Sequence, residues 1–307
     1  MKVRYRQFHV RVAAARQLSP SFLRITFTGD DLAGFGCGGY DQRLKIILPA
    51  AGGTLTDMPS GDDWYDRWRA LPNDRRPVLR TYTVRAARPE QAQVDVDFVL
   101  HGDVGPASRW AAAARPGDEA MLLGPDRPGT GRPWGCEWSP PDGARRLLLA
   151  GDETAVPAVS AVLECLPATA PVTALLEVPS AADALDIAAP GADVRWLPRD
   201  GGGHGARTAD GGHAAHGARL AHAVREIVAG WVAPSADSGE VVDIDVDNSI
   251  LWEVPDAEAP SDGLYVWLAG EAAVVQGLRR YLVGELCLPR GAVAFMGYWR
   301  RGRPEPN

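Results

Sequence analysis

The sequence predicts two domains, an antiparallel β-barrel followed by a parallel α/β domain. Three observations lead to this fold class. Short stretches that alternate apolar and polar residues fill the first half of the chain, as in strands with one buried face. Unbroken apolar runs separated by helical patterns fill the second half, as in strands buried on both faces of a parallel sheet. The pattern changes after a segment rich in proline and glycine, 125–143, so we expect domains at residues 1–143 and 144–307.

The barrel strands are predicted from alternation and from the turn residues between them. Gly, Pro and Asp separate the alternating segments, which lie at 9–12, 23–28, 43–48, 94–100 and 119–123. Several short strands divided by such turns are typical of an antiparallel sandwich or barrel. One more strand is expected at 80–83, after the turn-rich stretch 71–74, and a short alanine-rich helix at 110–115.

The α/β domain is predicted from its apolar runs and from the helical spacing between them. Buried strands are expected at 146–150, 172–178, 194–197 and 264–269. Helices fit between them at 154–166, 216–231 and 271–286. Strands that alternate with helices indicate a parallel sheet covered by helices.

Composition excludes several classes of function. Of the 307 residues, 46% are hydrophobic and 23% are charged, as in soluble globular proteins. The net charge of −7 argues against nucleic acid as a partner, and no apolar run is long enough for a membrane span. The first residues lack the apolar core of a signal peptide. We therefore expect a cytoplasmic monomer without nucleic-acid or membrane partners.

The cysteines and one segment rich in glycine and histidine suggest no strong site. Cys37, Cys136, Cys165 and Cys287 form no C-x-x-C pair, so reduced structural thiols are expected. The segment 200–217 holds three of the six histidines. A metal site there is the alternative. We favour a flexible surface loop with incidental histidines, because glycine-rich chains are poorly preorganised for binding.

Two short motifs point to a flavin dinucleotide. In the strand Arg80-Thr81-Tyr82-Thr83, alternate side chains share a face, so Arg80 and Tyr82 offer a cation and a flat ring together. The turn Gly105-Pro106-Ala107-Ser108 opens the short helix, whose first N–H groups are suited to an anion. The strand would hold the flavin ring and a phosphate, and the helix start would hold the pyrophosphate. Taken alone, the strand motif also fits a packed tyrosine beside a solvated arginine.

The ends of the buried strands carry the remaining candidate residues. Asp152 and Glu153 follow a strand at the turn where α/β sheets bind nucleotides, although the G-x-G-x-x-G pattern is absent. They either point away from a pyrophosphate or cap the next helix. Glu271 follows the last buried strand and either caps a helix or faces a ligand. In the tail 297–302, Trp299 is either an aromatic lid on a planar ring or part of a terminal strand.

These segments occur together and in order in one protein family. Segments 80–83, 97–102, 105–111, 151–157, 270–271 and 297–302 follow one another along nearly the whole chain. The chain resembles a bacterial siderophore-interacting protein, a branch of the ferredoxin-reductase-like flavoproteins. The resemblance implies a six-stranded FAD-binding β-barrel and a parallel α/β domain that binds NADH or NADPH.

The resemblance also implies roles for single residues. The flavin would be held by Arg80, Thr81, Tyr82 and Thr83, lined by Asp97, Val99 and His101, with its pyrophosphate at Gly105, Ala107 and Ser108. The nicotinamide cofactor would meet Asp152, Thr154, Ala155, Glu271 and Trp299. A basic pocket for the ferric siderophore would contain Lys45, Arg127 and Arg300. Where the family often has Gly-Pro-Arg-Gly, this chain reads Gly124-Pro125-Asp126-Arg127, and its Gly/His-rich loop is longer.

The implied activity is reduction of a ferric siderophore with electrons from NAD(P)H through FAD. Reduction weakens the hold of oxygen ligands on iron, and flavin can link a two-electron donor to a one-electron acceptor. The alternatives are a flavin-dependent NAD(P)H reductase of another acceptor and a siderophore-binding protein without redox activity. The donor is open: Glu177 would favour NADH by binding a ribose diol, Arg199 would favour NADPH, and reduced ferredoxin is a third possibility.

Overall fold

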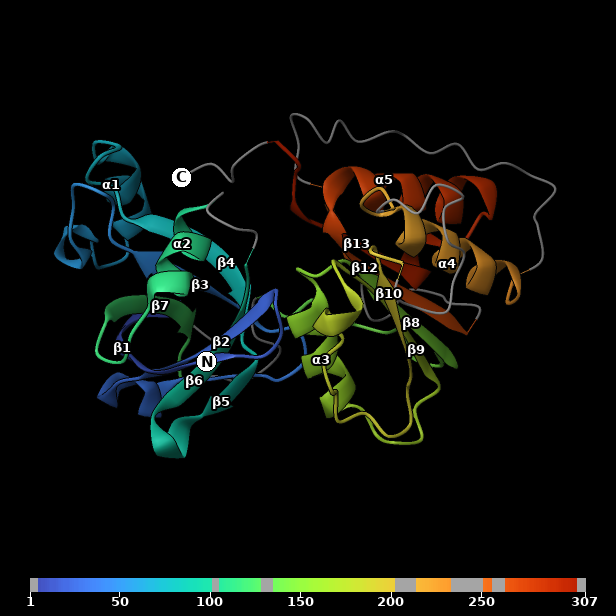
Figure 1. Cartoon of the computed structure of the whole chain (residues 1–307), viewed down its shortest axis with the longest axis horizontal. Coiled ribbons are helices and arrows are strands. Elements are labelled where there is room, and N and C mark those ends of the chain that lie inside the picture. The colour runs from blue at the N-terminus through green and yellow to red at the C-terminus, as the bar shows by residue number, and fades with distance from the viewer. Residues whose placement is uncertain are drawn as a thin grey trace. The chain divides into compact units, whose positions relative to one another are not determined.

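The chain consists of two compact units, and the boundary between them in the sequence lies between Cys136 and Glu137. The computed structural model describes residues 5–100, 105–127, 135–201, 214–232, 251–255 and 263–302, and the predicted His101 lies outside them. Figure 1 shows the helices and strands of both units. None of the helices in these ranges has the length and apolarity needed to cross a membrane.

The first unit is an antiparallel sheet of seven strands in the order β4-β3-β7-β1-β2-β6-β5. Its strands are β1 (Tyr5–Gln17), β2 (Phe22–Thr28), β3 (Arg43–Leu48), β4 (Val78–Thr83), β5 (Ala86–Arg88), β6 (Gln93–Val99) and β7 (Glu119–Pro125). The predicted antiparallel architecture is confirmed. The sheet has seven strands rather than six because the short β5 adds an edge to β6.

The interior of this unit explains why its strands alternate. One face contributes the aromatic core, which includes Phe8, Phe27 and Phe98. The ring of Tyr82 on β4 lies 4.5 Å from that of Phe98 on β6, so residues near opposite edges of the sheet meet around this core. Helix α2 (Pro106–Ala113) packs here as well, since Trp110 lies 6.2 Å from Phe98. The barrel seam is therefore formed by β4, β6 and α2.

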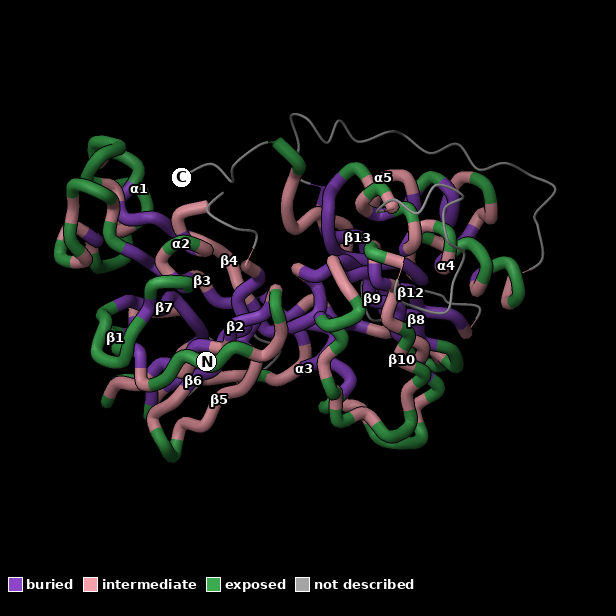
Figure 2. The backbone as a smooth tube through the Cα atoms, in the orientation of Figure 1, coloured by how far each residue is buried: buried purple, intermediate pink, exposed green. Residues whose placement is uncertain are grey.

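A small second cluster covers the other face of β3 and β4. It contains Ile47 and Leu79 together with Trp68 of α1 (Trp64–Ala70), a helix that the sequence analysis missed. Trp68 is buried, and its Nε1 donates a hydrogen bond to the carbonyl of Pro77 at 2.8 Å. Figure 2 shows that the buried residues run along the strands of both units.

The second unit contains a six-stranded sheet in the order β10-β9-β8-β12-β13-β11. Its elements are β8 (Arg146–Gly151), α3 (Val156–Cys165), β9 (Val172–Val178), β10 (Asp193–Pro198), α4 (Ala218–Ala229), β11 (Trp252–Glu253), β12 (Leu264–Glu271), α5 (Ala272–Arg279), η6 (Arg280–Glu285) and β13 (Val293–Trp299). The sheet is parallel, as predicted, but it has five parallel strands where four were predicted, since β13 pairs with β12, and the two-residue β11 adds an antiparallel edge. Single turns of 3-10 helix complete the described elements: η1 (Asp30–Gly34), η2 (Leu55–Asp57), η3 (Pro89–Gln91), η5 (Ala181–Asp183) and η7 (Arg290–Ala292).

The strand order places a switch point between β8 and β12. From β8 the chain moves through α3 to β9 on one side, whereas from β12 it moves through α5 to β13 on the other. Right-handed crossovers in opposite directions put α3 on one face of the sheet and α5, with α4, on the other (Figure 1). In sheets of this kind the carboxyl ends beside the switch point form the binding crevice.

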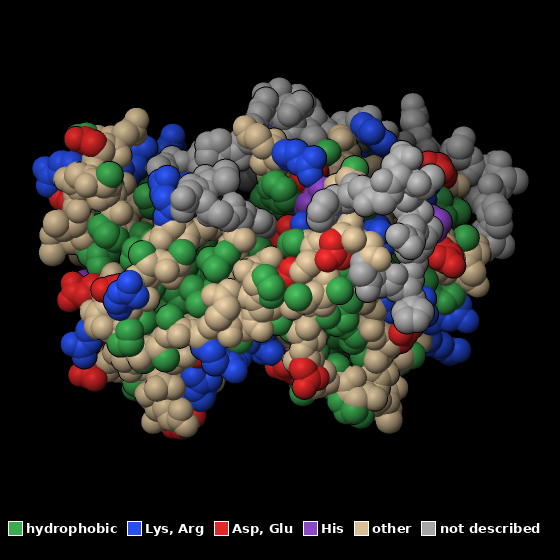
Figure 3. All heavy atoms as spheres, viewed as in Figure 1, with side chains coloured by type: hydrophobic (Ala, Val, Ile, Leu, Met, Phe, Trp, Pro, Cys, Tyr) green, Lys and Arg blue, Asp and Glu red, His purple; other side chains and the backbone are tan. Residues whose placement is uncertain are grey.

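Surface charge does not point to a polyanionic partner. The sequence carries 39 acidic and 32 basic residues. On the face drawn in Figure 3, the basic and acidic side chains of the described residues are interspersed over both units. This agrees with the expectation, still a prediction, that nucleic acid is not a partner.

Candidate functional site

The strand β4 presents the first group of predicted residues. The ring of Tyr82 packs on Phe98 and faces the barrel core. Arg80, two residues earlier on the same side of the strand, is half-buried, and its Nη1 donates to the carbonyl of Leu79 at 2.8 Å. Thr81, which stands between these two residues in the sequence, lies on the opposite side of the strand. A cation and an aromatic ring therefore stand side by side at the barrel seam, as the sequence predicts.

The start of α2 supplies an anion-binding group at the same seam. Ser108 Oγ donates to the carbonyl of Val99 at 3.2 Å and ties the first turn of the helix to the end of β6. No side chain among the described residues caps this helix at its N-cap, Gly105. A Cβ built on Gly105 would meet no atom within 4 Å, so open space lies before the helix start. The first N–H groups of a helix that its N-cap side chain does not cap are suited to a phosphate oxygen.

The predicted ligand Asp97 is engaged by protein groups. Its carboxylate accepts two hydrogen bonds from Arg24, at 2.7 and 2.8 Å, and lies 3.6 Å from Arg85 Nε. The carboxylate is almost fully buried. Asp97 is thus placed to orient two arginines. Sequence reasoning missed Arg24, because its partnership with Asp97 depends on the β2–β6 register, in which the two residues are direct cross-strand neighbours.

The neighbouring carboxylate of β6 is neutralised in the same way. Asp95 accepts hydrogen bonds from Arg88, at 2.7 and 2.8 Å, and from Thr26. Burial alone would raise the pKa of Asp95, but the Arg88 and Thr26 hydrogen bonds outweigh it and lower the pKa. Asp95 therefore remains ionised and paired with Arg88, so it does not place uncompensated negative charge beside α2.

These groups fit a flavin dinucleotide. The donor set consists of a guanidinium, an uncapped helix start and hydroxyl groups, which suits phosphates, and Tyr82 supplies an aromatic surface for a planar ring. Thr83, Val99 and Ala107 lie on the same elements, β4, β6 and α2. The structure thus places most of the described residues that the sequence assigned to FAD on β4, β6 and α2, but Thr81 lies on the opposite side of β4, against Lys45. The individual roles of these residues stay predictions.

Lys45 on β3 is the cross-strand neighbour of Thr81, so it lies on the side of β4 opposite to Arg80 and Tyr82. Its Nζ donates to Thr81 Oγ1 at 2.9 Å, in line with the register that pairs Lys45 with Thr81. A small cavity of about 30 Å³ opens here, and its lining includes Arg43, Leu44 and Tyr5. Two cations on one face of β3 therefore border a cavity that Thr81 of the proposed flavin strand also lines.

The other two predicted cations are placed differently. Arg127 is exposed beyond the end of β7, and its N–H donates to the carbonyl of Gly34. Arg300 is half-buried and follows β13 in the second unit. Lys45 and Arg127 thus belong to the first unit and Arg300 to the second. The grouping of these three residues into one basic pocket remains a prediction.

Asp152 organises the carboxyl edge of the second sheet at its switch point. Its Oδ1 accepts hydrogen bonds from the backbone N–H and the hydroxyl of Thr154, and its Oδ2 accepts from Glu271 N–H and Trp299 Nε1, at 2.8 and 2.9 Å. Gly270 has a positive φ of 147°, and a side chain there would collide with this carboxylate. Asp152 is fully buried beside Ala155, and it joins three turns instead of capping α3.

A buried ion-pair network continues from this turn. Arg199, just after β10, donates to both oxygens of Glu153, at 2.8 and 2.9 Å, and lies 3.3 Å from Glu177. Glu177 is fully buried and accepts the N–H groups of Gly217 and Leu220 at the start of α4. Both side chains are thus engaged inside the protein. This argues against Glu177 as a ligand of the ribose of NADH and against Arg199 as a residue that favours NADPH.

The acids of this network have divergent pKa values. Burial would raise the pKa of Glu153, but His216 and Arg199 outweigh it and lower the pKa to about 2. For Asp152, burial and the charge of Glu153 raise the pKa above the usual value, against the hydrogen bonds of Thr154 and Trp299. The pKa values of adjacent buried carboxylates differ in this way because two like charges are costly at short range.

Glu271 is a helix cap, one of the two alternatives that the sequence left open. Its Oε2 accepts the N–H groups of Ala273 and Val274, at 2.8 and 3.1 Å, in the first turn of α5. Its Oε1 accepts the N–H of Arg301 at 3.2 Å. Glu271 therefore fixes the chain that follows Trp299, and it lies next to Asp152 at the switch point.

His216 corrects the interpretation of the Gly/His-rich segment. Residues 202–213, with His204 and His213, lie outside the described residues. His216, expected to be incidental in a surface loop, is only 8% exposed and lies within 4 Å of two carboxylates, Asp152 and Glu153. This could not be predicted from the sequence, because the three residues meet only in the folded unit, where the turn after β8 lies beside the start of α4.

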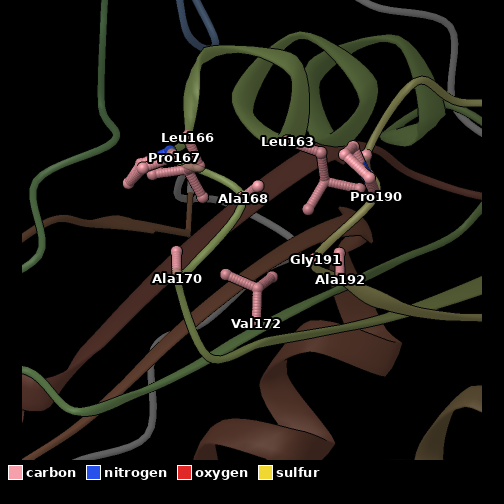
Figure 4. Close-up of a pocket in the computed structure, with 10 residues that line it drawn as sticks. Leu163, Leu166, Pro167, Ala168, Ala170, Val172, Pro190, Gly191 and Ala192 are labelled. Atoms are coloured by element: carbon pink, nitrogen blue, oxygen red, sulfur yellow. The ribbon is translucent and has the colours of Figure 1, made fainter.

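An apolar cavity at the opposite edge of the second sheet is not part of this site. Figure 4 shows its lining, which joins the end of α3 to the segments before β9 and β10, among them Leu166, Val172 and Pro190. Its volume of about 20 Å³ holds little more than one water molecule. It contains no charged side chain and lies at the amino ends of the strands, so we assign it no role in binding.

Comparison with known proteins agrees with this geometry. A model of the siderophore-interacting FAD-binding domain matches residues 11–129, and a model described as siderophore-interacting protein matches residues 144–302. The ferric vibriobactin reductase ViuB of Vibrio cholerae is 29% identical over 94% of this chain and 88% of its own length. For the NADPH-dependent ferric-chelate reductase of Escherichia coli, the identity is 28%, over 97% and 93% of the two chains.

A solved structure gives the same result. The siderophore utilization protein from T. fusca is 29% identical, with a TM-score of 0.67 over 99% of this chain and 96% of that chain. One family model spans most of the antiparallel unit, and the other spans the α/β unit. The chain therefore belongs to the siderophore-interacting protein family and contains its FAD-binding domain.

Proposed function

We propose that this protein is an FAD-dependent ferric-siderophore reductase that takes its electrons from NADH or NADPH. The observation that carries the proposal is the barrel seam, where Arg80 and Tyr82 meet the uncapped start of α2, with Lys45 on the same strand pair. Relatives of similar length are named ferric vibriobactin reductase and NADPH-dependent ferric-chelate reductase. We further propose that the protein acts in the cytoplasm as a monomer.

In this proposal the first unit holds the cofactor and the iron substrate. When bound, FAD accepts a hydride and returns electrons one at a time. Arg80 binds its phosphate by a charge-assisted hydrogen bond, the N–H groups of α2 bind the pyrophosphate, and Tyr82 orients the ring. One hydride carries two electrons, so each NAD(P)H reduces two ferric ions to ferrous ions and releases one proton.

The siderophore is proposed to bind beside β3 and β4. Ferric iron is held by hard oxygen ligands, and many such complexes are anionic. Lys45 and Arg43 border a cavity on one face of β3, and Arg127 lies beyond the end of β7 in the same unit. These cations raise the local concentration of an anionic complex even though the whole chain is acidic. Release follows reduction, because ferrous iron binds the same ligands less tightly.

The nicotinamide donor is proposed to bind at the switch point of the second sheet. Thr154, Glu271 and Trp299 surround Asp152 there, at the carboxyl ends of β8, β12 and β13. Asp152 and Glu153 are buried in protein contacts, so they hold the turn in place and are not presented to a phosphate. Because Glu177 and Arg199 bind each other, they are not proposed to distinguish NADH from NADPH.

The proposed function is tested by an anaerobic reoxidation experiment. The FAD-loaded protein is reduced with NADPH or with NADH, and a ferric siderophore is then added while the visible spectrum and a ferrous-iron trap are followed. We expect the oxidised flavin bands to return together with two trapped ferrous ions for each flavin. A flavin that is reoxidised by quinones but stays reduced with anionic and neutral ferric siderophores would assign the protein to another acceptor.

Replacing Lys45 with alanine is expected to slow the iron step alone. Loss of one charged contact costs about 1.5–3 kcal/mol, which corresponds to a rate roughly tenfold to a hundredfold lower for an anionic ferric siderophore. Stopped-flow measurement of the two half-reactions separates reduction of the flavin by NAD(P)H from its reoxidation. Lys45→Arg keeps the charge and serves as the matched control. Equal losses in both half-reactions would remove Lys45 from the siderophore pocket.

A further inference from the structure

The environment of His216 gives an inference beyond the proposed function. The residue lies just before α4, and its side chain is more than nine-tenths buried at the carboxyl edge of the second sheet. Its Nε2 is 3.7 Å from Asp152 Oδ2 and 3.6 Å from Glu153 Oε2. Neither ring nitrogen has a hydrogen-bond partner within ordinary range among the described residues. The imidazole is therefore placed at ion-pair distance from two carboxylates.

The same ring also packs against Trp299. The two rings meet edge to face, with centroids 5.2 Å apart and an interplanar angle of 87°. Trp299 Nε1 donates to Asp152 Oδ2, the oxygen that Nε2 of His216 approaches. The indole is thus held between a carboxylate that accepts its N–H and a ring that covers its side. Any change in charge on His216 acts directly on the acceptor of Trp299.

Counting the charges around His216 shows which form the site favours. Asp152 and Glu153 face it from the turn after β8, and Arg199 faces it from the end of β10. Trp299 on β13 is uncharged, and Glu177 and Glu271 bind backbone N–H groups at the starts of α4 and α5. Arg199 pairs with Glu153, so among the described residues a protonated His216 is the cation at ion-pair distance from Asp152. A buried charge without a partner is costly, which favours the imidazolium.

We propose that His216 is a positioning residue which, in its protonated form, holds Asp152 and thereby keeps Trp299 in place, so that the placement of Trp299 depends on pH. Burial by itself lowers the pKa of His216, but the contact with Glu153 and the charges of Asp152 and Glu153 outweigh it and raise the pKa above the usual value, in spite of Arg199. The proton belongs to the cluster as a whole, because its members titrate together.

The structural part of this proposal does not depend on the reductase activity. The indole N–H signals of the FAD-loaded protein can be followed by nuclear magnetic resonance after ¹⁵N labelling of tryptophan, and Trp299→Phe identifies the signal of Trp299. We expect this signal to shift in one step as the pH rises from 5 to 9, with a midpoint above the ordinary histidine value of about 6.5. A signal that does not move would overturn the proposal.

Three variants assign the step to His216. His216→Gln removes the titrating group, and we expect the pH-dependent shift of the Trp299 signal to be lost. His216→Arg keeps a permanent charge, and we expect the signal to stay near its low-pH position throughout. His222→Gln changes an exposed histidine on α4 and is the matched control, in which the step is retained. The amide and indole signals of the second unit, compared with those of the wild-type protein, show whether each variant keeps its fold. Persistence of the step in His216→Gln would overturn the assignment.

The kinetic part rests on the proposed function. If Trp299 helps to hold the nicotinamide donor, the rate of flavin reduction by NADPH falls as the pH rises through the same midpoint, and His216→Gln gives a flat profile. A rate that is independent of pH beside an intact titration of the Trp299 signal would overturn this kinetic part while the positioning role stands. A protein that shows the titration but is not reduced by NADH or NADPH would instead contradict the proposed donor.

Discussion

Replacing Arg199 with methionine is expected to destabilise the second unit by about 3–5 kcal/mol, because it leaves two buried carboxylates without their shared cation. Arg199 donates to both oxygens of Glu153, and it also reaches Glu177. Methionine has a similar length and leaves little empty space. The loss therefore measures uncompensated charge and not a cavity. Urea unfolding gives the size of the effect, and hydrogen exchange at the amides of α3 and α4 locates it.

The same network predicts how stability responds to acid. Glu153 has a pKa of about 2 in the folded protein, below its ordinary value of 4.5. A carboxyl group whose pKa is lowered by folding stabilises the fold above pH 4.5, and this contribution is lost as the pH falls toward 2. The wild-type protein is therefore expected to lose stability over that range more steeply than Arg199→Met. Arg195→Met breaks the exposed pair with Asp193 on β10, the strand that precedes Arg199, and should cost less than about 1 kcal/mol. Equal losses for the two variants would contradict the predicted role of Arg199.

The strands were predicted well because their pattern is local. The predicted 43–48 and 172–178 coincide with β3 and β9, since alternation and unbroken apolar runs are each visible within one strand. Among the missed elements are α1 and β5, of seven and three residues, which are too short to show a period. The strand at 80–83 begins two residues earlier, at Val78, because Pro77 precedes it and breaks the pattern.

The site was predicted only where its residues are neighbours in sequence. Arg80 and Tyr82 share a strand, so their common face follows from the period of two. The pairings of Lys45 with Thr81 and of Arg24 with Asp97 depend on register, which a single sequence does not define. The ion pairs of Arg199, Glu153 and His216 depend on two strand ends and the start of α4, which meet in the folded unit. That is why the sequence suggested nucleotide recognition for Arg199 and no role for His216.

Replacing Arg80 with alanine is expected to remove most of the bound FAD. Arg80 is half-buried at the barrel seam, close to Tyr82 and on the strand that faces the start of α2. A hydrogen bond to a charged group contributes about 1.5–3 kcal/mol, so its loss corresponds to FAD binding roughly 10- to 100-fold weaker. The ratio of flavin to protein after purification, and titration of the apoprotein with FAD, measure this change.

Two control variants separate the fork-shaped phosphate contact from simple charge. Arg80→Lys keeps the charge but loses the paired N–H groups, so we expect an intermediate affinity for FAD. Arg69→Ala removes an exposed arginine from α1 in the same unit and should leave the affinity unchanged. If Arg80→Ala retained FAD as the wild-type protein does, the anion site would consist of the α2 start alone. The assignment of the phosphate to β4 would then be wrong. If only the charge of Arg80 matters, Arg80→Lys should bind FAD as tightly as the wild-type protein. If the paired N–H groups matter, the affinity of Arg80→Lys should lie between those of the wild-type protein and Arg80→Ala.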